Sequence, residues 1–155
     1  MKTIALLSIS LLLLACASSD DFTGGRLLDC KSGEALEVRA GIDQESFERG
    51  GMGRGEILFL IEVANNSHED VTVKSIGVSP RRTQNAPFEN VTRAVNQDIA
   101  EGSEHLFKLP TTAFSRALPE PDSRSRGGEN YEFSVHVNLT NGDSYVCHFE
   151  ARLMY

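Results

Sequence analysis

The sequence predicts an all-β domain, folded as an antiparallel sandwich. Apolar and β-branched residues gather in short runs, and the last two runs, 131–139 and 145–153, alternate apolar with polar residues. Turn-forming clusters separate the runs, as at residues 31–33 (KSG) and 65–67 (NNS). Short strands divided by turns are typical of sandwiches and barrels. We therefore expect one β-sandwich domain of about seven strands at residues 26–155.

The expected strands follow in order along the chain. Residues 36–39 (LEVR) alternate after the first turn, and residues 56–64 (EILFLIEVA) form a dense apolar run. Residues 71–79 (VTVKSIGVS) are rich in β-branched side chains and stop at a proline, as do residues 104–109 (EHLFKL). Each of these runs has the length and composition of a strand.

Residues 91–99 are ambiguous. Val91, Val95 and Ile99 recur at a spacing of four, which places them on one face of a helix. The pattern predicts either one short amphipathic helical turn or a weak strand.

The two closing strands are specific enough to predict their register. Their apolar residues are odd-numbered in both 131–139 and 145–153, so both sets face the core only if opposite residues have numbers that sum to an even value. A two-residue loop, 141–142, gives an odd sum. A three-residue loop, 140–142, with Gly142 in the left-handed conformation gives an even one. We therefore predict the pairs Phe133–Phe149, Val135–Cys147 and Val137–Tyr145.

Three stretches also resemble a known architecture. They are ILFLIEVANNSHEDVTVKSIGVSP, IAEGSEHLFKLP and YEFSVHVNLTNGDSYVCHFEARL. Their order of strand, Asn-x-Ser turn, strand, glycine-led strand and closing hairpin resembles the Ig-like or fibronectin-type sandwiches of bacterial envelope proteins. The resemblance spans residues 30–154 and lacks the buried tryptophan of antibody domains, since the chain has no Trp. It implies architecture and carries no functional residue.

The first fifteen residues have the organisation of an export signal. Lys2 provides a positive start, and residues 4–14 are mostly apolar. This run is shorter than the roughly 20 residues that cross a membrane as a helix, but it fits the core of a signal peptide. It ends with LLAC at residues 13–16, which resembles the lipobox of bacterial lipoproteins.

The lipobox resemblance implies where the protein resides. In that family the peptide before the cysteine is removed, here residues 1–15, and the cysteine, here Cys16, carries acyl chains that anchor the protein to a membrane. Residues 16–25 would form the tether of the anchored domain. Aspartate after the lipidated cysteine favours retention at the inner membrane, and here Ala17 follows. The resemblance thus favours the outer membrane, facing the periplasm, over the inner membrane.

Composition limits the partners of such a protein. The net charge of −7 becomes −8 when Lys2 is removed with the signal peptide, which argues against binding to nucleic acid or to anionic lipid headgroups. Besides Cys16, the chain has only Cys30 and Cys147. In an oxidising periplasm these two have a single intramolecular pairing, so we expect a disulfide. It would stabilise the fold by roughly 3–5 kcal/mol.

Few residues suggest a binding site. In the register above, His136 and His148 are diagonal neighbours on the outer face of the closing strands. They form either a surface metal or pH-responsive site or part of an ordinary polar face. Arg116, Arg124 and Arg126 cluster in a segment that is either a carboxylate- or phosphate-contacting patch or a solvated loop.

The sequence therefore favours a non-catalytic binding or structural module of the cell envelope. No nucleophile motif or cofactor motif is present, so we expect no catalytic residue and no cofactor. The expected partners are the membrane, through Cys16, and an envelope protein that contacts loops 80–90 and 110–130. One alternative rests on residues 27–40 (LLDCKSGEALEVRA), which resemble the first strand of lipoprotein inhibitors of lysozyme but lack their Ser-Gly-x-x-Tyr loop. Another is metal binding through His136 and His148.

Overall fold

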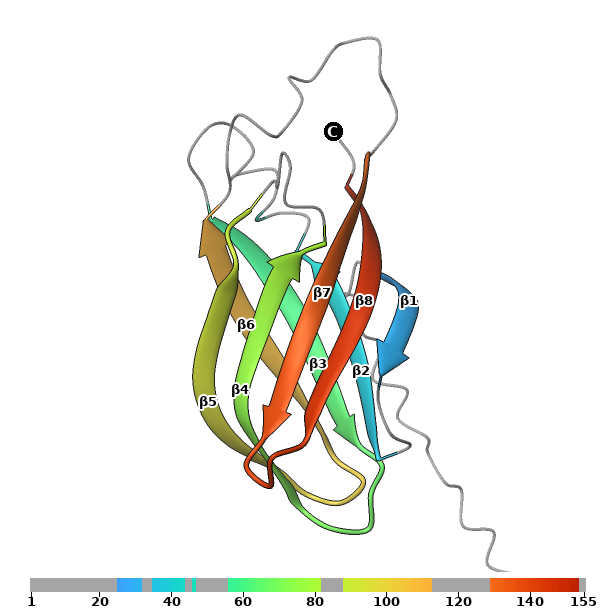
Figure 1. Ribbon diagram of the computed structural model, residues 1–155, viewed down its shortest axis with the longest axis vertical. Coiled ribbons are helices and arrows are strands. Elements are labelled where there is room, and N and C mark those ends of the chain that lie inside the picture. Colours follow the sequence, from blue (N-terminus) through green and yellow to red (C-terminus); the bar gives the residue numbers. More distant parts are fainter. Residues whose placement is uncertain are drawn as a thin grey trace, which may run out of the picture.

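The computed structural model is the predicted all-β sandwich (Figure 1). It describes residues 25–31, 35–43, 46, 56–81, 88–112 and 129–153. Eight antiparallel strands occur where about seven were expected: β1 (Arg26–Lys31), β2 (Leu36–Ile42), β3 (Glu56–Asn65), β4 (Val71–Pro80), β5 (Val91–Ile99), β6 (Glu104–Thr112), β7 (Glu129–Leu139) and β8 (Ser144–Leu153).

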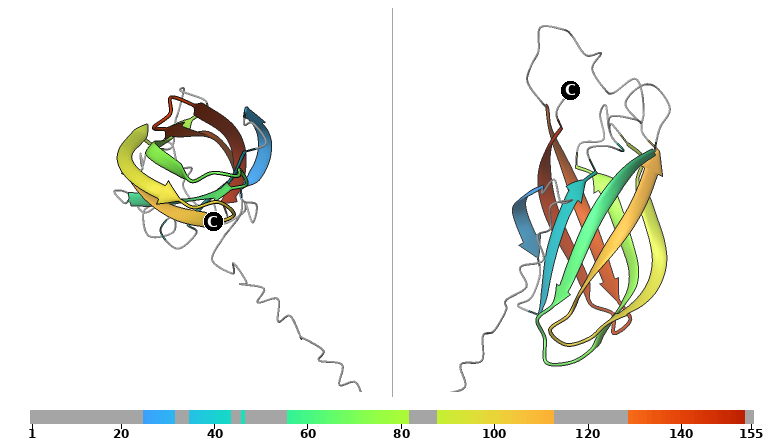
Figure 2. Two further views of the ribbon diagram at one scale, coloured as in Figure 1. Left: turned by 90° about the horizontal axis from the view of Figure 1, so that it is seen from below. Right: turned by 180° about the vertical axis from the view of Figure 1, so that it is seen from behind.

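The strands form a five-stranded sheet in the order β1-β8-β7-β4-β5 and a three-stranded sheet in the order β2-β3-β6. Figure 2 shows from below that the two sheets curve around a common interior. At one side the backbone links them, because the amide of Gly25 donates to the carbonyl oxygen of Ala40 at 2.9 Å. A Cβ atom on Gly25 would lie 2.7 Å from that oxygen, so only glycine permits this approach.

The core is formed by apolar side chains that alternate with exposed ones along the strands. Four phenylalanines that are almost completely buried, Phe59, Phe88, Phe133 and Phe149, lie between the sheets. The ring centroids of Phe59 and Phe88 are 4.8 Å apart, and those of Phe59 and Phe133 are 5.1 Å apart. Both pairs meet edge to face, an arrangement that aromatic rings favour.

The predicted closing hairpin is confirmed. Phe133 pairs with Phe149, Val135 with Cys147 and Val137 with Tyr145. The amide of Leu139 donates to the carbonyl oxygen of Asp143 at 2.9 Å, which leaves residues 140–142 as the loop. Gly142 has a φ of 98°, the left-handed region that the even register requires.

The helical alternative for residues 91–99 is wrong, because this segment is strand β5. A spacing of four fits both structures, since four is close to the helical period and is also a multiple of the strand period of two. The strand carries a bulge: Val73 pairs with Gln97 and Ser75 with Ala94, so two residues of β5 oppose Lys74. Asn96, one of those two, has a φ of 48°.

Candidate functional site

The two histidines lie on the outer face of the five-stranded sheet, in the predicted register. Ser134 opposes His148, and its hydroxyl lies 2.7 Å from Nδ1 of that ring. The hydroxyl of Ser79 on β4 lies 3.2 Å from Nε2 of His136. Each histidine thus has a serine partner on a neighbouring strand.

The surroundings of His136 favour its neutral form. Partial burial lowers its pKa below the usual value, and the neighbouring His148 lowers it further. Across the part of the chain that the structure describes, no three histidine, cysteine, aspartate or glutamate side chains gather closely enough to hold a metal ion. The proposed metal site therefore gains no third ligand from these residues.

The rest of this face is also paired. Glu132 and Glu150 oppose each other, and each has an arginine. Glu150 lies 2.6 Å from Arg26, and Glu132 lies 3.3 Å from Arg81. We call the side chains of Ser79, Glu132, Ser134, His136, Asn138, His148 and Glu150 the polar face. Asn138 bonds both Ser75 and Ser144, so the polar atoms of this face largely satisfy one another.

The predicted cysteine pair lies behind the polar face. Cys30 on β1 opposes Cys147 on β8 with their Cα atoms 4.0 Å apart, and the two sulfur atoms are at bonding distance. Cys147 is completely buried. The pair joins an edge strand to the closing hairpin.

The remaining predicted site residues lie outside the described part of the chain. These are the lipidation site, Cys16, and the arginines of the suggested patch, Arg116, Arg124 and Arg126. The same holds for most of the two loops that were expected to contact a partner, namely residues 82–87 and 113–128.

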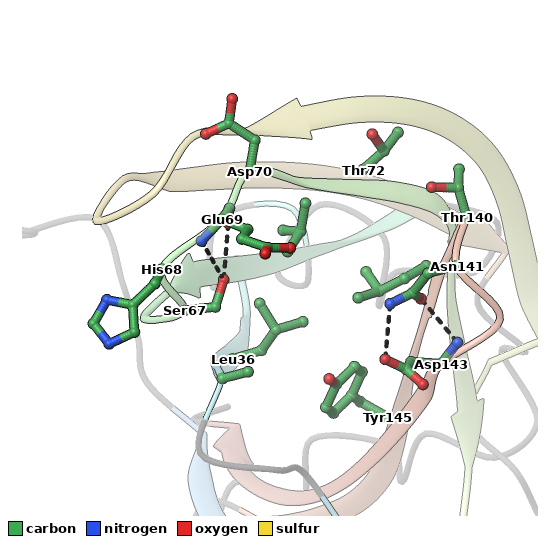
Figure 3. A pocket seen from close by; sticks show the side chains of 13 residues that line it. Leu36, Ser67, His68, Glu69, Asp70, Thr72, Thr140, Asn141, Asp143 and Tyr145 are labelled. Atoms are coloured by element: carbon green, nitrogen blue, oxygen red, sulfur yellow. Dashed lines mark hydrogen bonds between the residues drawn. The ribbon is translucent and has the colours of Figure 1, made fainter.

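Sequence reasoning missed a hollow of about 430 Å³ at one end of the sandwich, where the β3–β4 and β7–β8 connections meet (Figure 3). Residues 67–72, residues 139–141 and Asp143 line it, together with Ala35 and Leu36 at the start of β2 and Tyr145 on β8. We call it the hairpin-end hollow. Leu36 belongs to one sheet and Tyr145 to the other, so the hollow opens between the two sheets.

Backbone hydrogen bonds fix the walls of the hairpin-end hollow. The amide of Thr140 donates to the carbonyl oxygen of Thr72 at 3.0 Å, and the amide of Asn66 donates to that of Ala35 at 2.8 Å. The three chain segments around the hollow are thus tied to one another. A ligand would meet walls that are already formed.

Asn65 holds the loop that carries the acidic side of the hollow. Its side chain is completely buried, and its amide nitrogen donates to the carbonyl oxygens of Glu69 at 2.8 Å and of Ile99 at 3.0 Å. Its side-chain oxygen accepts hydrogen bonds from the amide and the hydroxyl of Ser67. The sequence marked residues 65–67 only as a turn, whereas the hydrogen bonds of the Asn65 side chain fix the conformation of the loop that follows it.

Three carboxylates lie around the hollow: Glu69, Asp70 and Asp143. Asp70 accepts a hydrogen bond from the amide of Glu101 at 3.0 Å, and Asp143 accepts one from the side chain of Asn141 at 2.9 Å. The carboxylate of Glu69 has no hydrogen-bond or ion-pair partner among the described residues. No lysine or arginine lines the hollow.

Tyr145 forms the inner wall. The residue is only 9% exposed, and Figure 3 shows its ring turned toward the hollow and Leu36. Its hydroxyl has no hydrogen-bond partner within the described ranges. Burial raises the pKa of this hydroxyl, and the charge of Asp143 raises it further, so the group stays protonated at neutral pH.

Comparisons with known proteins add to the fold and name no function. No family model matches the sequence. No curated protein matches it either. Among solved structures, the chain is similar to a protein described as late embryogenesis abundant (LEA), with a TM-score of 0.50 and 10% identity over 79% of this chain and 72% of that one. A protein from Archaeoglobus fulgidus has a TM-score of 0.47 and 12% identity over 80% of this chain and 98% of its own. At such identities the first likeness supports the sandwich fold alone.

Proposed function

We propose that this chain is a lipid-anchored module of the bacterial cell envelope that binds another envelope component and catalyses no reaction. The observation that carries the proposal is the LLAC sequence at residues 13–16 after an apolar signal core. Strand β1 begins at Arg26, ten residues after Cys16 in the sequence. A tether of this length reaches at most roughly 30 Å, so the domain would stay close to its membrane.

The cysteine pair is consistent with export. Paired cysteines persist in oxidising compartments such as the periplasm and are rare in the cytosol. Cys30 and Cys147 lie at bonding distance across two adjacent strands. Their geometry therefore supports a periplasmic location for the sandwich.

The described surface favours binding over catalysis. The Ser134–His148 and Ser79–His136 pairs lie on a pleated outer face, where substrate would remain exposed to water. The hairpin-end hollow contains neither pair. A catalytic serine or histidine needs a shaped pocket around the reacting atoms, and the hollow holds no such pair.

Metabolic labelling tests the anchor. We expect the wild-type chain to incorporate labelled palmitate and to partition into the detergent phase, because acyl chains dominate its partitioning. The variant Cys16→Ala should take up no label and stay in the aqueous phase or remain unprocessed. Ser18→Ala, two residues further on, is the matched control and should behave as wild type. An unlabelled wild-type chain would contradict the proposal.

Fractionation of the two membranes tests the location. We propose the outer membrane, facing the periplasm, because Ala17 follows Cys16. The variant Ala17→Asp should move the protein to the inner-membrane fraction on a sucrose gradient. A wild-type protein that sediments with the inner membrane would contradict this assignment.

A further inference from the structure

We propose that the hairpin-end hollow binds a positively charged nitrogen group on an apolar stem. This is the chemistry of a lysine or arginine side chain and equally of a free alkyl amine. The inference deepens the proposed function, since it names a ligand class for the binding module, and it depends on the binding role but not on the lipid anchor.

The charges around the hollow favour a cation over an anion. Glu69, Asp70 and Asp143 line it, and no lysine or arginine does. The carboxylate of Glu69 has no partner among the described residues, and Asp70 and Asp143 have only uncharged hydrogen-bond donors. An ammonium or guanidinium group in the hollow would donate hydrogen bonds to the oxygens of Glu69 and Asp143, whereas Figure 3 shows the carboxylate of Asp70 turned away from Tyr145 and Leu36.

Tyr145 is the independent sign of a ligand. It is 9% exposed, and its hydroxyl lacks a partner among the residues that the structure describes. No buried side-chain nitrogen or oxygen atom among the described residues lacks a hydrogen-bond partner, so this hydroxyl oxygen is accessible from the hollow while most of the ring is buried. The oxygen can accept a hydrogen bond from a bound ammonium group, and the ring offers a cation a favourable face.

The inner wall suits an apolar stem. Leu36, Val71 and Leu139 contribute aliphatic surface beside the ring of Tyr145. The volume of about 430 Å³ lies within the range of small-ligand sites. A four- or five-carbon stem can therefore contact these side chains while its charged end reaches the carboxylates.

A metal ion fits the hollow less well than an amine. Within the described residues, no three histidine, cysteine, aspartate or glutamate side chains are placed to hold one. Calcium needs six to eight oxygen ligands, which demands convergent carboxylates. An ammonium group needs only one or two acceptors at a time, and spread carboxylates supply them.

The hollow is also accessible from outside, because Glu69, Asp70 and Asp143, which line it, are exposed residues. Strand β1 starts at Arg26, close to Glu150, and runs toward the end where β8 begins at Ser144. The six residues of β1 span roughly 20 Å at about 3.3 Å per residue. The hollow therefore lies at the end of the sheet toward which β1 runs, away from Arg26.

Calorimetric titration of the full chain in mild detergent tests the proposal. The probes are cadaverine, the guanidinium compound agmatine, and a short capped peptide with one lysine between glycines. Pentanoate, an anion of similar length, and calcium chloride are the control ligands. We expect saturable binding of the cations that weakens as salt is added, and no binding of pentanoate.

Two variants test whether the cations bind in the hollow. Glu69→Gln removes the free carboxylate and should weaken cadaverine binding about three- to tenfold. Glu56→Gln makes the same charge change at the exposed start of β3, away from the hollow, and should leave the affinity unchanged. Both positions are exposed, so neither change should disturb folding.

The outcomes separate the possible sources. Binding of the lysine peptide at least as tight as that of cadaverine supports a protein partner's side chain, and preference for cadaverine or agmatine supports a free amine. Equal binding in Glu69→Gln and wild type, binding of pentanoate, or calcium binding tighter than amine binding would overturn the proposal. Palmitate labelling is read separately, so a failed anchor and a failed ligand are distinguishable.

Discussion

The polar face and the hairpin-end hollow are both rich in polar side chains, yet they differ in how those side chains are paired. On the polar face, serine hydroxyls bond the histidines and arginines pair with the opposed glutamates. In the hollow, the Glu69 carboxylate and the Tyr145 hydroxyl have no partner among the described residues.

This difference separates stability from binding. A polar group that already bonds a neighbour within the protein gains little from a ligand, because the ligand must replace an existing bond. A group without such a partner is bonded only to water, so a ligand can bond it without breaking a hydrogen bond within the protein. We therefore expect changes on the polar face to act on folding and changes in the hollow to act on affinity.

The largest loss of stability should come from breaking the disulfide between Cys30 and Cys147. Cys30→Ser opens a crosslink between residues 117 positions apart, and a loop of that length predicts a loss of about 4–5 kcal/mol in the free energy of unfolding. Urea denaturation measures this loss. The folded fraction of Cys30→Ser should keep the wild-type affinity for cadaverine, because neither cysteine lines the hollow. A loss below about 1 kcal/mol would contradict the role given to the crosslink.

Asn65→Ala should lower both the stability of the fold and the affinity of the hollow for amines. It removes side-chain hydrogen bonds to Ser67, Glu69 and Ile99 at a completely buried position, so we expect a loss of about 3 kcal/mol in stability. The loop that carries Glu69 and Asp70 should loosen, which weakens amine binding further. Asn66→Ala, at the next and exposed position, is the control for denaturation and titration. Equal losses of stability and of amine affinity in Asn65→Ala and Asn66→Ala would contradict the role of Asn65 in holding the loop.

The pH dependence of stability should reveal His136. Because its pKa is lower in the folded state, folding disfavours the proton. The fold therefore loses stability as the pH falls below the ordinary histidine pKa of about 6.5, and it keeps losing stability down to the folded-state value. His136→Gln should show a shallower decline in melting temperature between about pH 7 and 5. A decline as steep as that of wild type would assign the effect to other groups.

Much of the sandwich could be predicted from sequence, because strand alternation and turn residues are local signals. The register of the closing hairpin followed from the parity of its apolar residues together with the three-residue loop that ends at Gly142, and it placed Ser134 opposite His148 and both histidines on the outer face. Strand β5 stayed ambiguous, since its bulge at Asn96 interrupts alternation. The short strand β1 lies at a sheet edge and carries a register shift between Leu27 and Asp29, which weakens its pattern as well.

The hollow could not be predicted in the same way. Its walls come from residues far apart in the chain, so Leu36, Glu69 and Tyr145 meet only through the packing of the two sheets. The alternation of residues 145–153 predicts only that Tyr145 is a core residue of the closing hairpin. A signal was present at Asn65, since an asparagine with a serine two positions on forms a compact turn, but nothing local indicated what that turn encloses.

The comparison of Tyr145→Phe with Ser134→Ala tests the separation of the two regions most directly, because each removes one hydroxyl group. We predict that Tyr145→Phe weakens cadaverine binding about fivefold and changes the free energy of unfolding by less than about 0.5 kcal/mol. Ser134→Ala should leave the affinity unchanged and lower stability by about 1 kcal/mol, because the ring of His148 loses its partner. Equal losses of affinity in the two variants, or none in either, would contradict the account.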